Sequence, residues 1–260
     1  MPVDSLALVS PVTAPCRVVA QMTNYVSHVK GAGMDPKTIP LTFFRKASGS
    51  ISGPFDEIIK PPHVKLLDYE VEVGLVIGRD ILVGTELTES NLADFIAGLV
   101  VTNDVSARDV QLTKTQFYEA KSYPTFSPVG PALVLLDAGE LKRFGDLRLR
   151  LRVSGEMRQN MLVDGDMIYK PLQALQALAR FQRLGAGDLV MTGTPVGTAL
   201  GAPPKPIASL LPPAVKWKAF FKRQANNPKY LQHGDIVELS VATDDGAIDL
   251  GTQRTAVRYA

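Results

Sequence analysis

The stretch L-D-Y-E-V-E-V-G-L-V-I, from Leu67 to Ile77, decides the fold. Valine, isoleucine and tyrosine dominate it, and these residues favour a β-strand. Because side chains alternate along a strand, Asp68, Glu70 and Glu72 share one face, with roughly 6.6 Å between neighbours. Two carboxylates at that spacing can converge on one cation, and a buried charge needs such a partner. The stretch therefore indicates either a divalent-metal site or a half-exposed strand with a solvated acidic face.

A second apolar run ends in a further acidic residue. Residues 98–105 read G-L-V-V-T-N-D-V, with Asp104 near the end, and Arg108 and Gln111 follow shortly after it. A third carboxylate would complete a set of oxygen ligands that leaves room for water and substrate, which is how Mg²⁺ is commonly held. The alternative is local: Asp109 caps the next helical turn and Arg108 pairs with it.

Two loops rich in proline and glycine carry more polar groups. Residues 121–134 read K-S-Y-P-T-F-S-P-V-G-P-A-L-V, and their prolines make the loop a rigid platform for the ammonium group of Lys121. Residues 189–197 read L-V-M-T-G-T-P-V-G, a strand that runs into a Gly-Pro turn. Thr194 offers a hydroxyl group in that turn.

In this order, the segments are similar to the fumarylacetoacetate hydrolase family. The resemblance spans about residues 16–258, with one break, and it implies the mixed β-rich (α+β) fold of that family, a β-roll or mixed β-sandwich with few helices. The matching motifs are N-Y-V-S-H (24–28), D-Y-E-V-E (68–72), N-D-V-S-A-R-D-V-Q (103–111), K-S-Y-P-T-F-S-P-V-G-P (121–131), T-G-T-P-V-G (192–197) and Y-L-Q-H-G-D-I-V-E (230–238).

The resemblance also implies a role for each matching position. Glu70, Glu72 and Asp104 match the ligands of a divalent ion, Mg²⁺ or Mn²⁺, which Ca²⁺ can replace in crystals. Lys121 and His28 match catalytic residues, and the histidine belongs to a mobile loop that activates water in family hydrolases. The positions that match substrate-binding residues are Tyr25, Arg108, Gln111 and Thr194.

One departure from the family pattern concerns the base. Family hydrolases commonly carry a glutamate three residues after the histidine, whereas this chain reads H-V-K-G, with Gly31 at that position. A histidine without this partner lacks the group that fixes its tautomer and raises its basicity. Asp35, Asp56 and Glu57 are candidates to replace the missing carboxylate in space.

Three functions follow from these residues. A metal-dependent hydrolase that cleaves a C–C bond in a 1,3-dicarbonyl, acylpyruvate-like acid, in aromatic or keto-acid catabolism, ranks first because His28 is kept. An oxaloacetate decarboxylase, keto–enol isomerase or hydratase needs the same metal and enolate stabilisation but no hydrolytic water. A non-catalytic binding protein on the same fold is the third alternative. The resemblance implies a homodimer.

Composition is that of an ordinary globular enzyme. Of 260 residues, 45% are hydrophobic and 21% are charged. The net charge of +2, without a basic run, gives no argument for nucleic-acid binding. No run of about 18 apolar residues predicts a membrane span, and residues 1–15 lack the pattern of a signal peptide. The single cysteine, Cys16, fits a reducing compartment, so we expect a cytoplasmic protein.

The chain divides into two expected parts. Residues 1–62 form an N-terminal segment whose irregular part, 27–62, is rich in glycine and proline and is a candidate lid over the site. Residues 63–260 form the catalytic domain, with an insertion at about 201–229. Within it, residues 215–224 predict a short amphipathic helix, whose aromatic residues we interpret as packing on the domain rather than as a flap or dimer contact.

Periodicity places the remaining elements. Residues 147–153 alternate L-R-L-R-L-R-V, which predicts a strand with one solvated face. Residues 171–184 carry leucines at helical spacing, with Gly185 just beyond them, and predict a helix. Further strands are expected at residues 16–26, 67–78, 97–105, 131–136, 188–193, 235–242 and 254–259.

Overall fold

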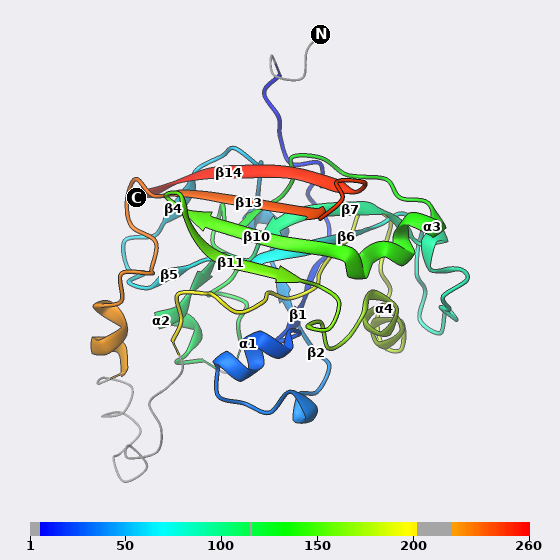
Figure 1. Cartoon of the computed structure of the whole chain (residues 1–260), viewed down its shortest axis with the longest axis horizontal. Coiled ribbons are helices and arrows are strands. Elements are labelled where there is room, and N and C mark those ends of the chain that lie inside the picture. The colour runs from blue at the N-terminus through cyan, green and yellow to red at the C-terminus, as the bar shows by residue number, and fades with distance from the viewer. Residues whose placement is uncertain (1–5, 115, 202–219) are drawn as a thin grey trace.

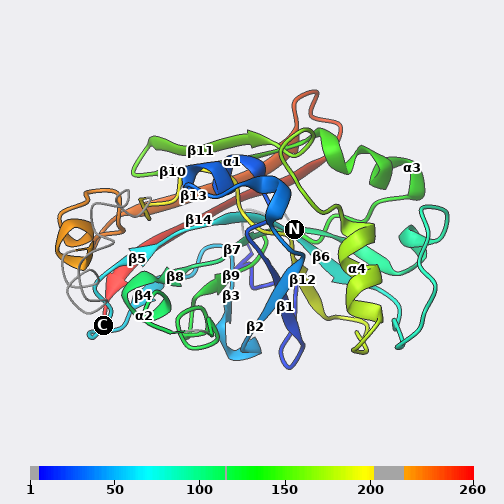
Figure 2. The same ribbon diagram turned by 90° about the horizontal axis from the view of Figure 1, so that it is seen from below.

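Two five-stranded sheets face each other in this computed structural model, which describes residues 6–114, 116–201 and 220–260 (Figure 1 and Figure 2). The first sheet has the strand order β2-β1-β12-β6-β7 and the second the order β11-β10-β13-β14-β4. The first consists of β2 (Thr42–Lys46), β1 (Val18–Met22), β12 (Leu189–Met191), β6 (Val71–Ile77) and β7 (Ile96–Asn103). The second consists of β11 (Glu156–Leu162), β10 (Leu147–Val153), β13 (Ile236–Thr243), β14 (Asp249–Tyr259) and β4 (Ile58–Lys60). The predicted β-rich fold is confirmed.

Short elements flank the sheets. Two small ladders pair β3 (Ile51–Ser52) with β9 (Ser127–Pro128) and β5 (Leu67–Asp68) with β8 (Ser106–Ala107). The helices are α1 (Val26–Gly31), α2 (Arg108–Gln111), α3 (Ala138–Leu141) and α4 (Pro171–Ala179), with 3₁₀ turns at Pro36–Thr38, Ser48–Ser50, Leu92–Asp94 and Lys142–Asp146. The helices α3 and α4 lie at one end of the sheets and α2 at the other (Figure 1 and Figure 2). No helix in the described ranges is long and apolar enough to cross a membrane.

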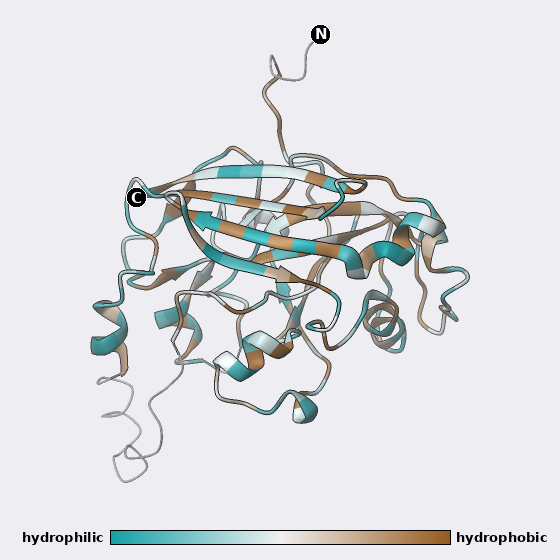
Figure 3. Ribbon diagram, viewed as in Figure 1, coloured by the Kyte–Doolittle hydropathy of each residue, from teal (hydrophilic) through white to brown (hydrophobic). Residues whose placement is uncertain are grey.

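The second sheet has one buried face and one solvent-exposed face, as the alternation in the sequence of β10 predicts. Leu147, Leu149 and Leu151 of β10 are fully buried against the first sheet, whereas the arginines between them point outward. The same alternation of apolar and polar residues is visible along β10 and β13 in Figure 3. Strand β10 has the predicted bounds.

Strand β6, an inner strand of the first sheet, is buried on both faces. Every residue of β6 is buried, because the main core covers one face and a smaller apolar cluster covers the other. That second cluster contains Val12, Val18, Ala20, Val76, Val100, Val129, Leu189 and Met191. The interpretation of β6 as a half-exposed strand with a solvated acidic face is therefore wrong.

Three predicted segments need correction. The run 67–78 is two strands, because the chain leaves the ladder at Tyr69 and Glu70 between β5 and β6. Residues 131–136 form one isolated bridge, between Val134 and Leu99, because the prolines and glycine before them interrupt pairing. The region 27–62 is not irregular, since it contains α1, β2, β3 and β4, and β2 pairs with β1 in the first sheet.

Other predicted elements differ in their bounds. Strand β1 ends at Met22, and residues Val26–Gly31 are helical instead of irregular. Helix α4 ends at Ala179, five residues before the predicted end. In the insertion, residues 220–225 are helical, and residues 215–219 of the predicted helix lie outside the described residues.

Gly74 gives a test of packing at the centre of β6. A β-carbon at Gly74 would lie 2.7 Å from Val100 Cγ2 and 2.8 Å from both Leu189 Cδ1 and Thr102 Cγ2. We expect Gly74→Ala to lower the free energy of unfolding by about 1–3 kcal/mol because the core has no room for the methyl group. Gly49→Ala, whose β-carbon meets open space, is the control and should be neutral or slightly stabilising. Urea denaturation measures both; equal stability of Gly74→Ala and the parent would contradict this account of the sheet.

Candidate active site

One cavity of about 190 Å³ gathers most of the predicted site residues. It lies beside the ends of β6 and β7, where α1, α2 and the loop after β12 meet. The predicted residues that line it are His28, Glu70, Glu72, Asp104, Arg108, Gln111, Lys121 and Thr194. Tyr25 is different, because its side chain is fully buried in the main core and is not among the lining residues in the described part of the chain.

The break between β5 and β6 brings three carboxylates together. The backbone N–H of Glu70 donates to Asn103 Oδ1 at 3.0 Å, and the backbone N–H of Asp104 donates to Glu70 O at 2.9 Å. These bonds tie the start of β6 to the end of β7. Glu70, Glu72 and Asp104 each then offer one carboxylate oxygen, and the three oxygens lie within 4.8 Å of one another.

Three buried cations surround this trio. Lys121 Nζ donates to Glu70 Oε2 and Asp104 Oδ2, both at 2.6 Å. Arg108 donates from Nε to Asp68 Oδ2 at 2.7 Å and also pairs with Glu70. Lys46 of β2 donates to the other oxygen of Asp104 and to a backbone carbonyl. Asp109 pairs with backbone N–H groups of residues 65 and 66 rather than with Arg108, so the local alternative for these two residues is wrong.

The charges of the cluster do not cancel. Four buried carboxylates, with Asp68 included, meet three cations, so one negative charge remains. Glu72 carries it: in the described residues its side chain accepts one hydrogen bond, from the backbone N–H of Gly193 at 2.8 Å, and forms no ion pair. Burial, and then the negative charges of Asp104 and Glu70, raise the pKa of Glu72 well above its ordinary value.

Among the partner groups, neighbouring charges outweigh burial in setting the pKa of Glu70 and of Lys121, but not that of Lys46. Burial alone would raise the pKa of Glu70, but the charges of Arg108 and Lys121 overcome it and hold that pKa below its ordinary value. Burial lowers the pKa of Lys46 despite its contact with Asp104. For Lys121, the carboxylates of Asp104 and Glu70 outweigh burial and raise the pKa.

The donor set fits a divalent ion. All three groups are carboxylates, which hard cations such as Mg²⁺, Mn²⁺ and Ca²⁺ prefer. The trio is buried, and the surplus negative charge lies on Glu72, within the trio. A bound divalent cation would satisfy this charge, so Glu70, Glu72 and Asp104 are the residues that would hold the ion.

His28 reaches the cavity from α1, whose start is anchored to the core. Asp166 accepts hydrogen bonds from the backbone N–H and the hydroxyl of Ser27, at 2.7 and 2.5 Å. Burial lowers the pKa of His28, although the side chain keeps some solvent contact. The structure assigns no hydrogen bond to the His28 ring from any residue it describes.

The carboxylates considered as substitutes for the missing glutamate are engaged elsewhere. Asp35 accepts a hydrogen bond from the backbone N–H of Lys37, and Asp56 accepts one from the backbone N–H of Gly53. Glu57 forms an ion pair with Arg258. None of these three candidates forms a hydrogen bond or ion pair with the His28 ring in the described part of the chain.

Two of the predicted substrate-binding side chains already have protein partners. The hydroxyl of Thr194 donates to Val71 O and accepts from Gln159 Nε2, both at 2.9 Å. Gln111 Oε1 accepts from Arg108 at 2.8 Å. These contacts show that Thr194 and Gln111 also hold the walls of the cavity in place.

Sequence reasoning missed Lys46, Gln159 and the structural role of Asp68. Asp68 orients Arg108 and accepts hydrogen bonds from the backbone N–H groups of Ala199 and Leu200, at 2.7 and 3.1 Å. Lys46 ends the strand T-F-F-R-K, in which two of the five residues are apolar, so the sequence gives no signal that this lysine is buried.

Fold and site together define the class: a β-rich enzyme of the fumarylacetoacetate hydrolase type, with a buried acidic trio that can hold a divalent ion. The family model described as fumarylacetoacetate (FAA) hydrolase C-terminal matches residues 17–258. The chain belongs to this family.

Named relatives and solved structures agree with that assignment. The chain is 34% identical over 201 residues to the mitochondrial oxaloacetate tautomerase Fahd2a of Rattus norvegicus; the match covers 77% of this chain and 62% of the relative, so the chain spans less than two thirds of that relative's length. It is 26% identical to 5-carboxymethyl-2-hydroxymuconate delta-isomerase from Mycobacterium smegmatis, with a TM-score of 0.74 over 100% of this chain and 85% of that one. It is 30% identical to a fumarylacetoacetate hydrolase from Exiguobacterium antarcticum, with a TM-score of 0.75 over 100% and 80% of the two chains.

Glu72→Gln tests the surplus charge. A carboxyl group whose pKa is higher in the folded protein than in the unfolded chain destabilises the fold increasingly as the pH rises above the unfolded value. We therefore expect the metal-free variant to melt roughly 2–4 °C above the parent at pH 8, and to bind Mn²⁺ more than about 10-fold more weakly. Calorimetric melting with and without Mn²⁺ measures both effects.

Glu238→Gln, in β13 of the second sheet, is the control for Glu72→Gln. It should change neither the melting temperature nor the affinity for Mn²⁺. A Glu72→Gln protein that Mn²⁺ stabilises as strongly as the parent would contradict the assignment of this ligand.

Proposed function

We propose that the protein is a divalent-metal-dependent enzyme that interconverts the keto and enol forms of a small 1,3-dicarbonyl acid, with oxaloacetate as the first candidate. One observation carries the proposal: His28 shares a cavity with the acidic trio and its cations, yet no described carboxylate supports its ring. Keto–enol exchange needs a base that moves a proton and charges that stabilise an enolate, but no activated water. The names of the curated relatives support this choice.

The cations of the cavity hold the acid. Arg108 and Lys121 place positive charge beside the position where the carboxylate or enolate oxygen of the substrate lies. Asp68 fixes the guanidinium of Arg108, so this charge is oriented before the substrate arrives. A bound divalent ion would supply Lewis-acid stabilisation of the enolate.

His28 moves the proton. Burial lowers its pKa, so the ring is neutral near pH 7 and one ring nitrogen can accept a proton. The ring takes the proton from the carbon between the two carbonyl groups and returns it to an oxygen, which converts the keto form to the enol form.

Hydrolysis of a C–C bond is the second candidate. It is favoured by the presence of His28 in the cavity, and it needs the histidine to activate water. At Gly31 a β-carbon would lie only 3.2 Å from Val196 Cγ2, so a supporting side chain at this position requires Val196 to move. Because no described carboxylate supports the His28 ring, we place tautomerisation before hydrolysis. A homodimer in the cytoplasm that acts in keto-acid breakdown completes the proposal.

Product analysis tests the reaction. We expect the protein with Mg²⁺ or Mn²⁺ to speed the keto–enol exchange of oxaloacetate, followed by ultraviolet absorbance, with no change of mass. A chelator, or the Glu70→Gln substitution, should lower the rate by about 10²-fold or more because enolate stabilisation is lost. Glu238→Gln should keep the rate.

Three results would contradict the proposed reaction. Two acid fragments from an acylpyruvate would show a hydrolase, and release of carbon dioxide from oxaloacetate would show a decarboxylase. A rate that the chelator leaves unchanged would exclude the role given to the acidic trio.

The pH profile tests the base. Because burial lowers the pKa of His28, kcat/KM should stay constant from pH 8 down to about 6.5 and fall only below that pH, where the ring becomes protonated. His28→Gln should lower kcat by about 10²–10⁴-fold and remove the acidic limb of the profile. His63→Gln is the control, since His63 lies on the surface beside Tyr123. An acidic limb that persists in His28→Gln would assign the titration to another group.

A further inference from the structure

The cavity that holds the acidic trio is small. At about 190 Å³ it lies below the range of roughly 300–1,000 Å³ that is usual for ligand sites. It has room for the dicarbonyl head of a keto acid, and any longer substituent must extend into a neighbouring space. Two neighbouring cavities exist among the described residues: one of about 830 Å³ beside β2, and one of about 310 Å³ on the other side of His28.

The larger cavity adjoins the acidic trio directly. Met22, Phe44 and Phe117 line both cavities, so these side chains form the common wall. Lys46 also lines the larger cavity, and the ammonium group of this residue pairs with Asp104 of the acidic trio. A substituent that extends from the head toward β2 therefore enters this cavity alongside the two aromatic rings.

The two rings of the wall are arranged as a pair. Phe44 of β2 and Phe117, on the loop after α2, have centroids 5.7 Å apart and planes at 70°, an edge-to-face contact. The ammonium of Lys121 lies 5.4 Å from the centroid of Phe44. Both rings are only partly buried, so each presents surface to the larger cavity. An aromatic group can pack on such a pair with a favourable geometry.

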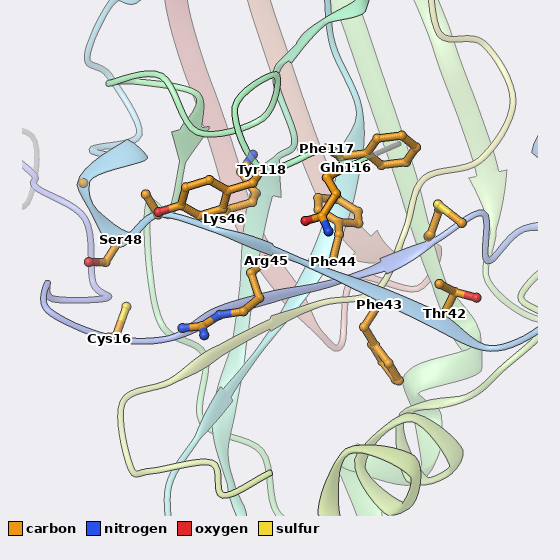
Figure 4. A pocket seen from close by; sticks show the side chains of 13 residues that line it. Cys16, Thr42, Phe43, Phe44, Arg45, Lys46, Ser48, Gln116, Phe117 and Tyr118 are labelled. Carbon is orange, nitrogen blue, oxygen red and sulfur yellow. The ribbon is translucent and has the colours of Figure 1, made fainter. Parts of the chain in front are cut away.

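The rest of the lining suits an aromatic or apolar substituent. Figure 4 shows Tyr118 on the same side of β2 as Phe44 and Phe117, whereas Phe43 points to the other side. Ser48 and Gln116 add neutral polar groups. The described lining includes no carboxylate, and its two cationic residues are Lys46, which pairs with Asp104, and Arg45, which points to the same side of β2 as Phe43 (Figure 4).

We propose that the cavity beside β2 is a subsite for the acyl substituent of the substrate, and that Phe44 and Phe117 select an aromatic acyl group. The inference rests on the proposed function, because the acidic trio and its cations must hold the dicarbonyl head. The preferred substrates are then 1,3-dicarbonyl acids with an aromatic substituent on the carbonyl remote from the carboxylate, whereas oxaloacetate occupies the site of the dicarbonyl head alone.

Two probes that differ only in this substituent test the subsite. Acetylpyruvate carries a methyl group and benzoylpyruvate carries a phenyl group on the same head. We expect the Mn²⁺-loaded protein to bind benzoylpyruvate about 10-fold more tightly, measured by calorimetry. Phe117→Ala should reduce the ratio of the two dissociation constants to about one. Gly49→Trp, whose side chain starts in open space within the cavity lining, should weaken benzoylpyruvate binding about 10-fold by filling the subsite.

Val196→Ala is the matched control, because Val196 lines the cavity on the other side of His28, and it should keep the parent ratio. The proposal is overturned if the parent protein binds the two probes equally, if it binds neither, or if the preference survives in both Phe117→Ala and Gly49→Trp. It is also overturned if Val196→Ala, rather than Phe117→Ala, removes the preference. Binding is measured apart from turnover, so a failed tautomerase assay with a retained phenyl preference would reject the reaction and keep the subsite.

Discussion

A surplus negative charge buried at the start of β6 is the constraint on which the rest of the site depends. Charge in an apolar interior is costly unless it is paired, and here four carboxylates share three cations. Glu70 and Asp104 each contact cations, which leaves Glu72 with a raised pKa. The arrangement is poor for stability in the absence of a further cation, and it is the arrangement that a divalent-metal enzyme needs.

The fold meets this constraint by bringing cations from separate parts of the chain. Lys46 comes from the edge strand β2, Arg108 from α2, and Lys121 from the loop before β9. Each occupies a buried position, so each depends on the sheets being formed. Because Asp68 holds Arg108 and also binds the backbone at Ala199 and Leu200, the cation set and the loop after β12 are positioned together. Stability and site geometry are thus parts of one network.

Much of the site could be predicted from the sequence because its chemistry is local in the chain. Glu70 immediately precedes β6, Glu72 lies in β6, and Asp104 immediately follows β7, so the pairing of β6 with β7 brings the three carboxylates together. The burial pattern of β10 follows from its L-R-L-R-L-R-V alternation for the same reason. These features depend on periodicity, which a single sequence contains.

The features that were missed depend on contacts between distant segments. Lys46 contacts Asp104, from which it is separated by 58 positions in the sequence, and no local sequence pattern predicts such a pair. The break at Tyr69 and Glu70 arises because β5 pairs with β8 while β6 pairs with β7; the residues themselves favour an unbroken strand. In the region 27–62, glycine and proline are frequent, but the short run T-F-F-R-K still joins the first sheet because β1 offers a partner.

The position of His28 links this network to the chemistry. Its helix is held through Ser27 and Asp166, outside the acidic cluster, so the position of the ring does not depend on the ion pairs of the trio. Its pKa is set mainly by burial, with opposing contributions from Glu70 and Arg108. A ring that is neutral near pH 7 suits the proposed transfer of a proton from the acidic carbon of a 1,3-dicarbonyl compound. Hydrolysis would require the same ring to activate water, a task for which a carboxylate partner ordinarily raises the basicity of a histidine, and no described carboxylate forms a hydrogen bond with this ring.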